Sequence, residues 1–517
     1  MFDSGSALGG SGAAGSVAGA GAVISGGVSG ISDAGCPGIP AGAAAGRLGS
    51  GAGFCARTNG AASAGMMRHV NSVFICGKTA RQHSGKIAFA KHPVETLAQS
   101  RTPRPSASLL TPCEAARQCL HLPEPVFFDS AVATADSISI IAACPSEIVA
   151  GSSERDWENL RQKLRANERS APLAGRGIPH GMAAGYVEYD GAFRFGFYHD
   201  LLIYEHGSAR WSEVGDFWSK LQPATLGHNN PLEFQPAISR KDFCRMVERA
   251  QRYIAAGDIY QVNLSHRFTA PWDGGDLFHF YELLRRCSPA PNAAYLRSAE
   301  RALLSASPES FLEMSSNRIC SRPIKGTRPR RADPRADDQS AHELVTSAKE
   351  AAELIMITDL ERNDLGQVCE YGSVRVPQLL TLERFAQVFH LVSTVEGRLR
   401  PEVDHVTALR ACFPGGSITG APKKRAREII AELEPAPRGL YTGAIGYFGF
   451  NGESRFSIAI RTAVVEPARE AQRNAECGEL YAHFHVGAGI VADSDPEMEY
   501  DETLHKAAGI LRAAEQL

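Results

Sequence analysis

The chain has 517 residues, of which 44% are hydrophobic, so it can bury the core of one large domain or of two to three ordinary ones. A formal net charge of -3, with no basic stripe interleaved with aromatic residues, gives no general attraction to nucleic acid or to an anionic membrane. No run of 18 apolar residues is present, so no transmembrane helix is expected.

Twelve cysteines are scattered singly along the sequence, and none belongs to a Cys-x-x-Cys pair. Neither a zinc site nor a disulfide framework is therefore expected in a chain of this size. Free thiols in a reducing, cytoplasmic compartment are the simplest interpretation.

Residues 1–122 differ in composition from the rest of the chain. The first 66 are mostly glycine, alanine and serine, which bury too little apolar surface to offset chain entropy, so we predict a disordered leader. The G-x-G-x-x-G pattern at 10–15 follows no predicted strand and is assigned to chance. Few acidic residues suggest an organelle transit segment, whereas Asp3 and the lack of arginine before Arg47 favour a non-functional extension, and both are left open.

Ordered structure is predicted to begin near residue 123. The sequence Asp190-Gly191 is a hairpin signal, and an amphipathic helix capped by Ser239 is predicted over 239–256. Many short strands mixed with helices, without regular β-α-β alternation, indicate an α+β fold. The runs that predict the first strands lie at 126–129, 137–142, 185–189 and 193–198.

The next segments carry candidate catalytic groups. A strand over 257–265 places Gln261, Asn263 and Ser265 on one face, which either lines a site or, more often, faces solvent. Lys325 lies in Pro-Ile-Lys-Gly-Thr-Arg, and a lysine amine becomes a nucleophile when its surroundings lower its pKa. Glu309, in a turn before a strand at 311–314, is a general-acid candidate if it faces Lys325.

Two Glu-x-x-Glu pairs suggest a metal site. Glu350 and Glu353 share a face of a helix predicted over 340–357, and Glu499 and Glu502 share a face of a last helix opened by Pro496. Like charges on one helix face repel each other, and a cation would relieve the repulsion. Four carboxylates in two pairs can hold a hard cation such as Mg²⁺, although each pair alone is usually a solvated face.

Further residues are typical of a site that binds an anion. The glycine-rich turn at 413–423 precedes a basic helix start, where backbone N–H groups could hold a carboxylate. Gly487 and Gly489 lie in a strand predicted over 486–491 and leave room for a ligand. Arg461, in an apolar strand predicted over 457–462, would need a carboxylate partner, and His390 alone could be an ordinary core histidine.

Together and in this order, these segments resemble the chorismate-utilising enzymes, which include the first components of anthranilate synthase and aminodeoxychorismate synthase, isochorismate synthase and salicylate synthase. Long motifs at 357–366, 413–423 and 499–503 carry the resemblance. It implies an α+β fold of two packed antiparallel sheets with outer helices and the site between them. The chain would then consist of the leader (1–122), an N-terminal lobe (123–235) and a chorismate-binding catalytic region (236–517).

The resemblance also implies roles for single residues. Glu309 matches the general acid that helps a ring hydroxyl leave, and Thr327 and His390 match residues around the reacting ring. Glu353 and Glu502 match direct ligands of Mg²⁺, with Glu350 and Glu499 acting through water. The positions implied to bind substrate are Gly326, Tyr441, Arg461, Gly487, Gly489 and Gln261.

Two positions discriminate within the family. Members that add water to the ring have a lysine base where this chain has Gln261, and a glutamine cannot deprotonate water. Anthranilate synthases usually read Pro-Ile-Ala-Gly-Thr, whereas aminodeoxychorismate synthases read Pro-Ile-Lys-Gly-Thr, as this chain does at Lys325. The resemblance thus implies conversion of chorismate and ammonia to 4-amino-4-deoxychorismate for folate synthesis, with Lys325 attacking the ring. Anthranilate synthase component I and a non-catalytic chorismate-binding relative are the alternatives.

A partner protein is expected for the same reason. The chain has no Gly-x-Cys-x-Gly nucleophile motif for hydrolysing glutamine, so ammonia would come from a separate glutamine amidotransferase subunit or from solution.

Overall fold

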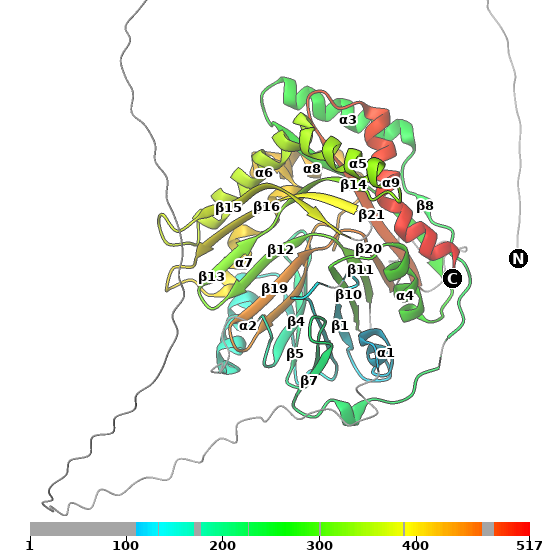
Figure 1. The fold of residues 1–517 in the computed structure, drawn as a ribbon, viewed down its shortest axis with the longest axis vertical. Coiled ribbons are helices and arrows are strands. Elements are labelled where there is room, and N and C mark those ends of the chain that lie inside the picture. Colours follow the sequence, from blue (N-terminus) through cyan, green and yellow to red (C-terminus); the bar gives the residue numbers. More distant parts are fainter. Residues whose placement is uncertain are drawn as a thin grey trace, which may run out of the picture. The chain divides into compact units, whose positions relative to one another are not determined.

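The computed structural model describes residues 110–132, 134–169, 177–225, 227–298, 301–385, 388–467 and 480–517 (Figure 1). Residues 1–109, most of the predicted leader, lie outside the described residues. The described residues all belong to one compact unit of the chain.

Two antiparallel sheets form the centre of the described structure (Figure 1). The first has eleven strands in the order β17 (Gly420–Ala421), β9 (Gln261–Trp272), β21 (Leu480–Ile490), β20 (Thr462–Pro467), β11 (Ala302–Ser307), β10 (Asn292–Arg297), β1 (Val126–Asp129), β2 (Ile138–Ala142), β6 (Leu201–Glu205) and β7 (Arg210–Val214), and β8 (Gln235–Pro236) pairs with β9. The second has ten strands in the order β14 (Ile324–Pro329), β16 (Val388–Arg398), β13 (Arg318–Ser321), β12 (Ser310–Ser315), β19 (Glu453–Ile458), β18 (Ala444–Gly449), β4 (Met182–Val187), β5 (Phe193–Tyr198) and β3 (Ile148–Gly151), and β15 (Arg375–Arg384) pairs with β16.

The predicted N-terminal lobe and catalytic region share both sheets. Strand β1 pairs with β10, and β4 pairs with β18, so strands from before and after residue 236 are neighbours in the same ladders. Each pairing buries backbone groups that would otherwise form an open sheet edge. The boundary at 236 is therefore not a boundary between two sheets.

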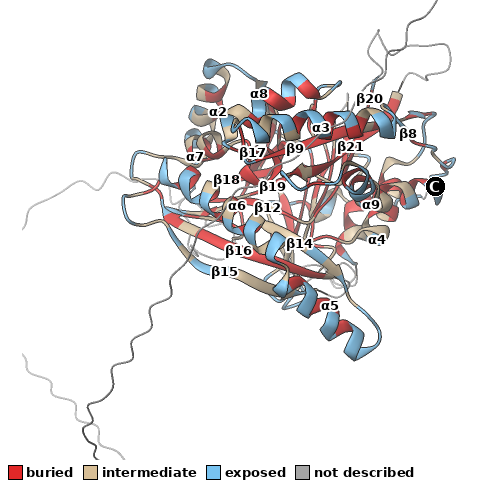
Figure 2. Ribbon diagram, turned by 90° about the horizontal axis from the view of Figure 1, so that it is seen from above, coloured by how far each residue is buried: buried red, intermediate tan, exposed pale blue. Residues whose placement is uncertain are grey.

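Helices cover the outer faces of the sheets, and Figure 2 shows that they expose one side while the strands are mostly buried. On the first sheet, apolar clusters hold α3 (Arg240–Ala255), α4 (Leu277–Cys287), α8 (Lys423–Leu433) and α9 (Pro496–Glu515). On the second, they hold α2 (Glu154–Ala166), α5 (Pro334–Thr346), α6 (Ala348–Gly366) and α7 (His405–Cys412). A third cluster joins Leu303 and Val464 of the first sheet to Ile445 and Tyr447 of the second, so the sheets pack face to face.

Most of the predicted elements are confirmed. The predicted strands overlap β1, β2, β4, β5 and β12, although β4 begins and ends earlier than the predicted 185–189, and β4 and β5 form the hairpin around Asp190-Gly191. Ser239 caps α3 by accepting a hydrogen bond from the N–H of Asp242, and Pro496 lies in the first turn of α9. The α+β fold of two packed antiparallel sheets with outer helices is thus the observed one.

Two predicted elements are wrong. The helix expected over 340–357 is two helices, because Ser347 has an extended backbone (ψ 107°) and its side chain caps α6 through the N–H of Glu350. Arg461 is not in a strand: it lies between β19 and β20 in the left-handed region, with φ +50°. Glu350 and Glu353 nevertheless both belong to α6, so they keep their i,i+3 spacing.

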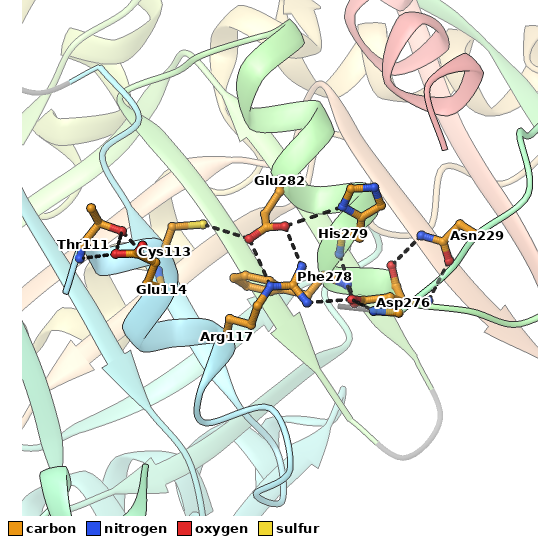
Figure 3. A network of polar contacts seen from close by, with 10 residues as sticks. Thr111, Cys113, Glu114, Arg117, Asn229, Asp276, Phe278, His279 and Glu282 are labelled. Carbon is orange, nitrogen blue, oxygen red and sulfur yellow. Dashed lines mark hydrogen bonds and ion pairs between the residues drawn. The ribbon is translucent and has the colours of Figure 1, made fainter. Parts of the chain in front are cut away.

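Ordered structure also begins before the predicted boundary at residue 123. Helix α1 (Pro112–Arg117) has a capping box between Thr111 and Glu114. Figure 3 shows how its last residue, Arg117, reaches α4, where its guanidinium pairs with Asp276 at 2.6 Å and Glu282 at 2.5 Å. Its Cζ also lies 5.1 Å from the centre of the Phe278 ring. These contacts, named here the α1–α4 anchor, fix a segment that composition alone assigned to the leader.

None of the helices among the described residues is long and apolar enough to cross a membrane. The eight cysteines in the described part of the chain are all free thiols, as predicted.

Candidate active site

The polar row predicted on β9 faces the second sheet. Even-numbered residues such as Leu264 and Phe268 pack under the outer helices, so odd-numbered ones point to the other side. Gln261 and Ser265 are buried rather than solvent-facing, and Gln261 Oε1 has no hydrogen-bond partner. Because a buried polar atom without a partner costs free energy, this row fits a ligand-binding surface better than a core.

The two glycines of β21 lie beside this row and open space in front of it. Gly487 pairs with Ser265 and Gly489 with Asn263 in the antiparallel ladder. A Cβ at Gly487 would stand 2.8 Å from the Tyr441 hydroxyl, and one at Gly489 would stand 2.5 Å from Gln261 Nε2. Any other residue would fill the space between these polar groups, so the structure needs glycine at both positions.

Lys325 and Glu309 approach each other from two strand ends of the second sheet. Lys325 lies in β14, where its Nζ donates to the carbonyl oxygen of Ser417 at 3.4 Å. Glu309 precedes β12, is 6% exposed, and its Oε1 has no partner. Burial raises the pKa of Glu309, although the nearby Ser417 hydroxyl and the Lys325 ammonium act in the opposite direction. Glu309 is therefore close enough for the charge of Lys325 to act on it, and its burial favours the protonated form that a general acid needs.

Arg461 belongs to the same group of residues. Burial lowers the pKa of Arg461, and the charge of Glu309 partly restores it. Glu309 is the carboxylate whose charge acts on Arg461, although the two residues form no salt bridge within the described part of the chain.

Thr327 and His390 are brought together by β14 and β16. They are opposite each other in the ladder, and Thr327 Oγ1 lies 2.9 Å from His390 Nδ1. A bulge between Lys325 and Thr327 is made by Gly326, whose φ of +71° favours glycine and whose added Cβ would stand 3.0 Å from the Glu350 carboxylate. Burial, with the charge of Arg461, lowers the pKa of His390 to about 4, so the ring is neutral near pH 7.

The four predicted metal ligands interact across α6 and α9. Burial raises the pKa of Glu353, and the charges of Glu350 and Glu502 raise it further, while Lys325 opposes them. Burial also raises the pKa of Glu499, with Glu502 contributing, although Ser494 donates a hydrogen bond to it at 2.7 Å. The two pairs are therefore close enough to repel each other.

Lysines balance part of this charge. Lys506 pairs with Glu502 at 2.7 Å, and despite the opposing effect of burial it holds the pKa of Glu502 below its usual range. Lys349 lies 3.8 Å from Glu499. Lys506 also donates to the carbonyl oxygen of Gly487 at 2.9 Å, which ties the glutamates to the glycines of β21.

The donor set fits a hard cation in its chemistry, since it supplies only carboxylate oxygens that repel one another. The carboxylates are too far apart to form a metal site in this structure: within the described ranges, no group of three or more histidine, cysteine or acidic side chains is close enough to hold a metal ion. Binding of Mg²⁺ by Glu353, Glu502, Glu350 and Glu499 stays a prediction.

Three residues of the site were missed by the sequence reasoning. Lys506 could have been found, because it follows Glu502 at i,i+4 spacing on one helix face. Ser417 lies in the glycine-rich turn at 413–423, but its own role was not predicted, and Lys349 gave no signal, because each residue acquires its role from the approach of another element, β14 for Ser417 and α9 for Lys349.

Comparison with known proteins places this site in a family. The sequence model of the chorismate binding enzyme family matches residues 124–512, and the chain belongs to this family. It is 46% identical over 315 residues to aminodeoxychorismate synthase component 1 of Salmonella typhimurium, covering 61% of this chain and 66% of that protein. It is 44% identical over 299 residues to anthranilate synthase component 1 of Bacillus caldotenax, covering 57% of this chain and 56% of that protein.

The chain thus spans 56% and 66% of the length of these two curated relatives. Among solved structures, it is similar to anthranilate synthase component I from Streptococcus pneumoniae, with a TM-score of 0.62 and 30% identity, covering 73% of this chain and 93% of that one. Relatives named for two different activities match at similar identity. The comparisons therefore define the family, and they do not distinguish between the two activities.

Proposed function

We propose that the chain is the first component of an aminodeoxychorismate synthase, which converts chorismate and ammonia to 4-amino-4-deoxychorismate for folate synthesis. The observation that carries the proposal is Lys325, placed beside Glu309 and the carboxylates of Glu353 and Glu502. An alanine at this position would leave no amine to attack the substrate ring.

The two groups divide the chemistry between them. The Lys325 nitrogen, after its ammonium form has released a proton to solvent, forms a bond to ring C2 while the bond from C4 to its hydroxyl breaks, and Glu309 gives its proton to the departing oxygen. Ammonia then bonds to C4 while the bond from Lys325 to C2 breaks, and the proton that ammonia loses replaces the one donated by Glu309. The sum is chorismate plus ammonia giving 4-amino-4-deoxychorismate plus water.

Other residues hold the substrate in place. Arg461 and Tyr441 would bind one carboxylate in the space left by Gly487 and Gly489, and neutral His390 with Thr327 would lie beside the ring. Glu353 and Glu502, supported by Glu350 and Glu499, would hold Mg²⁺, which supplies positive charge for the ring carboxylate. A glutamine amidotransferase subunit would supply ammonia, because the chain has no nucleophile motif for glutamine hydrolysis.

The main alternative is the first component of an anthranilate synthase, which the relatives of that name favour. There ammonia attacks C2 directly, and the retained Lys325 would have no covalent role. A non-catalytic chorismate-binding relative is disfavoured, because Lys325, Glu309 and both glutamate pairs are all present.

Product identity tests the proposal. The purified chain is incubated with chorismate, Mg²⁺ and an ammonium salt, and the products are separated by chromatography and identified by mass. We expect 4-amino-4-deoxychorismate, reduced at least about 100-fold by Lys325→Ala, with chorismate binding retained in calorimetry. Lys424→Ala, at an exposed lysine of α8, is the matched control and should behave as the parent chain.

Each other outcome points elsewhere. Anthranilate with pyruvate would assign the chain to the alternative, and a Lys325→Ala variant with normal turnover would refute the nucleophile. Chorismate binding without any product, with ammonium or with an added glutaminase subunit, would favour the non-catalytic relative.

A further inference from the structure

One buried ion pair beside the site has no part in the chemistry described so far. Glu434 is the C-cap residue of α8, and Arg438 lies in the loop between α8 and β18. Their side chains are 4% and 1% exposed, and Arg438 Nη2 donates to Glu434 Oε1 at 2.7 Å. Such a pair is weak evidence for stability, because taking two charges out of water offsets most of their attraction. Its contacts with other segments therefore indicate what it does.

The guanidinium of Arg438 joins three segments that are far apart in the sequence. Nη2 donates to the carbonyl oxygen of Asn263 in β9 at 2.7 Å. Nη1 donates at 3.1 Å both to the carbonyl oxygen of Ile418 and to the hydroxyl of Thr442. With the two bonds to Glu434, every N–H of the group is used, so one rigid, planar fork sets the separations of these segments.

Glu434 binds the polar row of β9 from the other end of the pair. The N–H and the hydroxyl of Ser265 donate to Glu434 Oε1 at 2.8 and 2.9 Å. Ser265 is opposite Gly487 in the ladder. The pair is thus bonded to two residues of the strand face that lines the site, Asn263 and Ser265.

The bond to Ile418 acts on the support of Lys325. Ile418 follows Ser417, whose carbonyl oxygen accepts a hydrogen bond from Lys325 Nζ at 3.4 Å. The same turn is bound to β9, since the N–H of Asn263 donates to the carbonyl oxygen of Thr419 at 2.9 Å. Because peptide groups are planar, holding the Ile418 carbonyl restricts the neighbouring peptide group and with it the Lys325 amine.

The bond to Thr442 acts on Tyr441. The Thr442 hydroxyl accepts from Arg438 and donates to the carbonyl oxygen of Tyr441 at 2.5 Å. Thr442 has a φ of +62°, a left-handed conformation that costs a β-branched residue free energy and persists only where the surroundings hold it. Arg438 Cζ also lies 5.6 Å from the centre of the Tyr441 ring. Arg438 therefore fixes the turn that presents Tyr441.

We propose that Arg438 is a positioning residue for the reaction: it holds the turn that supports Lys325 and the turn that presents Tyr441 at a fixed separation across β9, while Glu434 neutralises its charge and binds the strand. The inference rests on the proposed function only through the roles of Lys325 and Tyr441. A misplacement of about 1 Å between reacting groups costs about 100-fold in rate, so the loss of the fork should appear in turnover.

The first test removes the fork without leaving a buried charge unpaired. Arg438→Met combined with Glu434→Gln takes out both charges, and the glutamine oxygen can still accept from Ser265. Chorismate consumption with Mg²⁺ and an ammonium salt is measured per folded molecule, with the folded fraction given by urea denaturation. We expect kcat/KM to fall about 100-fold, while the urea midpoint shifts by less than about 1 M.

Arg438→Lys tests whether charge alone is enough. Its ammonium keeps a cation for Glu434, but three donors on a flexible stem do not reproduce the fork. We expect kcat/KM per folded molecule to be at least about 10-fold below that of the parent chain. The matched control is Arg117→Ala, at the cation of the α1–α4 anchor, which should lower the urea midpoint and leave kcat and KM unchanged.

Two results would overturn the proposal. If Arg438→Lys matched the parent chain in kcat and KM, the arginine would serve only to neutralise a buried charge. If the double variant had a lower urea midpoint and an unchanged kcat/KM per folded molecule, the pair would only support the fold.

A binding measurement separates this inference from the proposed function. Thr442→Val removes only the bond on the Tyr441 side, and we expect chorismate to bind about 5- to 10-fold more weakly in calorimetry. Unchanged affinity in both Thr442→Val and the double variant would contradict the placing of Tyr441 by Arg438. If the parent chain binds chorismate and forms no 4-amino-4-deoxychorismate, the proposed function fails, and a loss of affinity in the variants still supports the positioning role.

Discussion

Buried polar groups are paired in the α1–α4 anchor and lack partners on the inner face around β21, the surface that carries Gln261, Asn263 and Glu309. In the anchor, Arg117 lies between Asp276 and Glu282, and Asp276 also caps α4 through the N–H groups of Phe278 and His279 (Figure 3). On the inner face, Gln261, Asn263 and Glu309 each have a buried oxygen without a partner. The anchor is satisfied within the chain, whereas the inner face is satisfied only by something it binds.

Carboxyl pKa values show the same contrast. Against the effect of burial, the hydrogen bonds of Arg117 and of backbone N–H groups hold the pKa of Asp276 below its usual range. Burial raises the pKa of Glu309, Glu353 and Glu499, and no guanidinium pairs with any of the three among the described residues. Such perturbed groups cluster where a protein gives up stability for binding or catalysis.

Removing a charge from the inner face should therefore affect function and spare stability. Glu353→Gln removes one of four mutually repelling carboxylates, so we expect Mg²⁺ to bind at least about 10- to 100-fold more weakly while the free energy of unfolding stays equal or rises. Calorimetric titration with Mg²⁺ and urea denaturation measure the two quantities. Glu343→Gln, at an exposed acid of α5, is the control for lost charge.

Unchanged Mg²⁺ affinity in Glu353→Gln would remove this residue from the proposed metal site. A large loss of stability in Glu353→Gln would instead show that Glu353 stabilises the fold, as the carboxylates of the α1–α4 anchor do.

Removing a charge from the anchor should do the reverse. Arg117→Ala leaves Asp276 and Glu282 without their cation, so we expect the free energy of unfolding to fall by about 3 kcal/mol, with unchanged turnover per folded molecule. The matched control is Arg165→Ala, whose guanidinium is 59% exposed and pairs with Asp404, and which should cost about 0–1 kcal/mol. Equal effects of the two variants in urea denaturation would contradict the distinction between anchor and surface pair.

The sequence singled out the residues of the candidate site but not those of the anchor. Lys325, Glu309 and the two glutamate pairs stand in long motifs, and residue spacing alone brought each pair to one helix face. The anchor depends on Arg117 and Asp276, which are 159 positions apart, and no local pattern reports such a contact. Yet Thr111, Pro112 and Glu114 do form a readable helix start, which the glycine-rich composition before it obscured.

Local backbone breaks were the other source of error. The apolar spacing through Leu344, Ala348 and Ile355 continues across Ser347, so periodicity predicted one helix where the chain makes two. Serine is tolerated inside a helix and favoured at its cap, and only the tertiary packing decides between the two. Arg461 was misplaced for a similar reason, since nothing in its apolar neighbours announces a left-handed residue.

The two faces of strand β9 differ in the same way. In β9, Gln261 and Asn263 face the site, while His266 faces the outer helices, stacked on Tyr500 with ring centres 5.5 Å apart. His266 Nε2 lies 2.9 Å from the Thr503 hydroxyl, which itself donates to the Tyr500 carbonyl oxygen, so the ring nitrogen donates. Burial lowers the pKa of His266 to about 4, against an ordinary value of 6.5.

The neutral ring is the stable form, so its contribution to stability is complete above about pH 6.5 and is lost as the pH falls toward 4. By pH 5.5 we expect the parent chain to lose about 1–2 kcal/mol of unfolding free energy through this residue. In urea denaturation, His266→Phe should remove the acid loss of unfolding free energy that His266 causes and keep the loss that His390 causes. The control His342→Gln, at an exposed histidine, should keep both losses. If His266→Phe retained the full acid loss, burial of the His266 ring would not be the source of this part of the pH dependence.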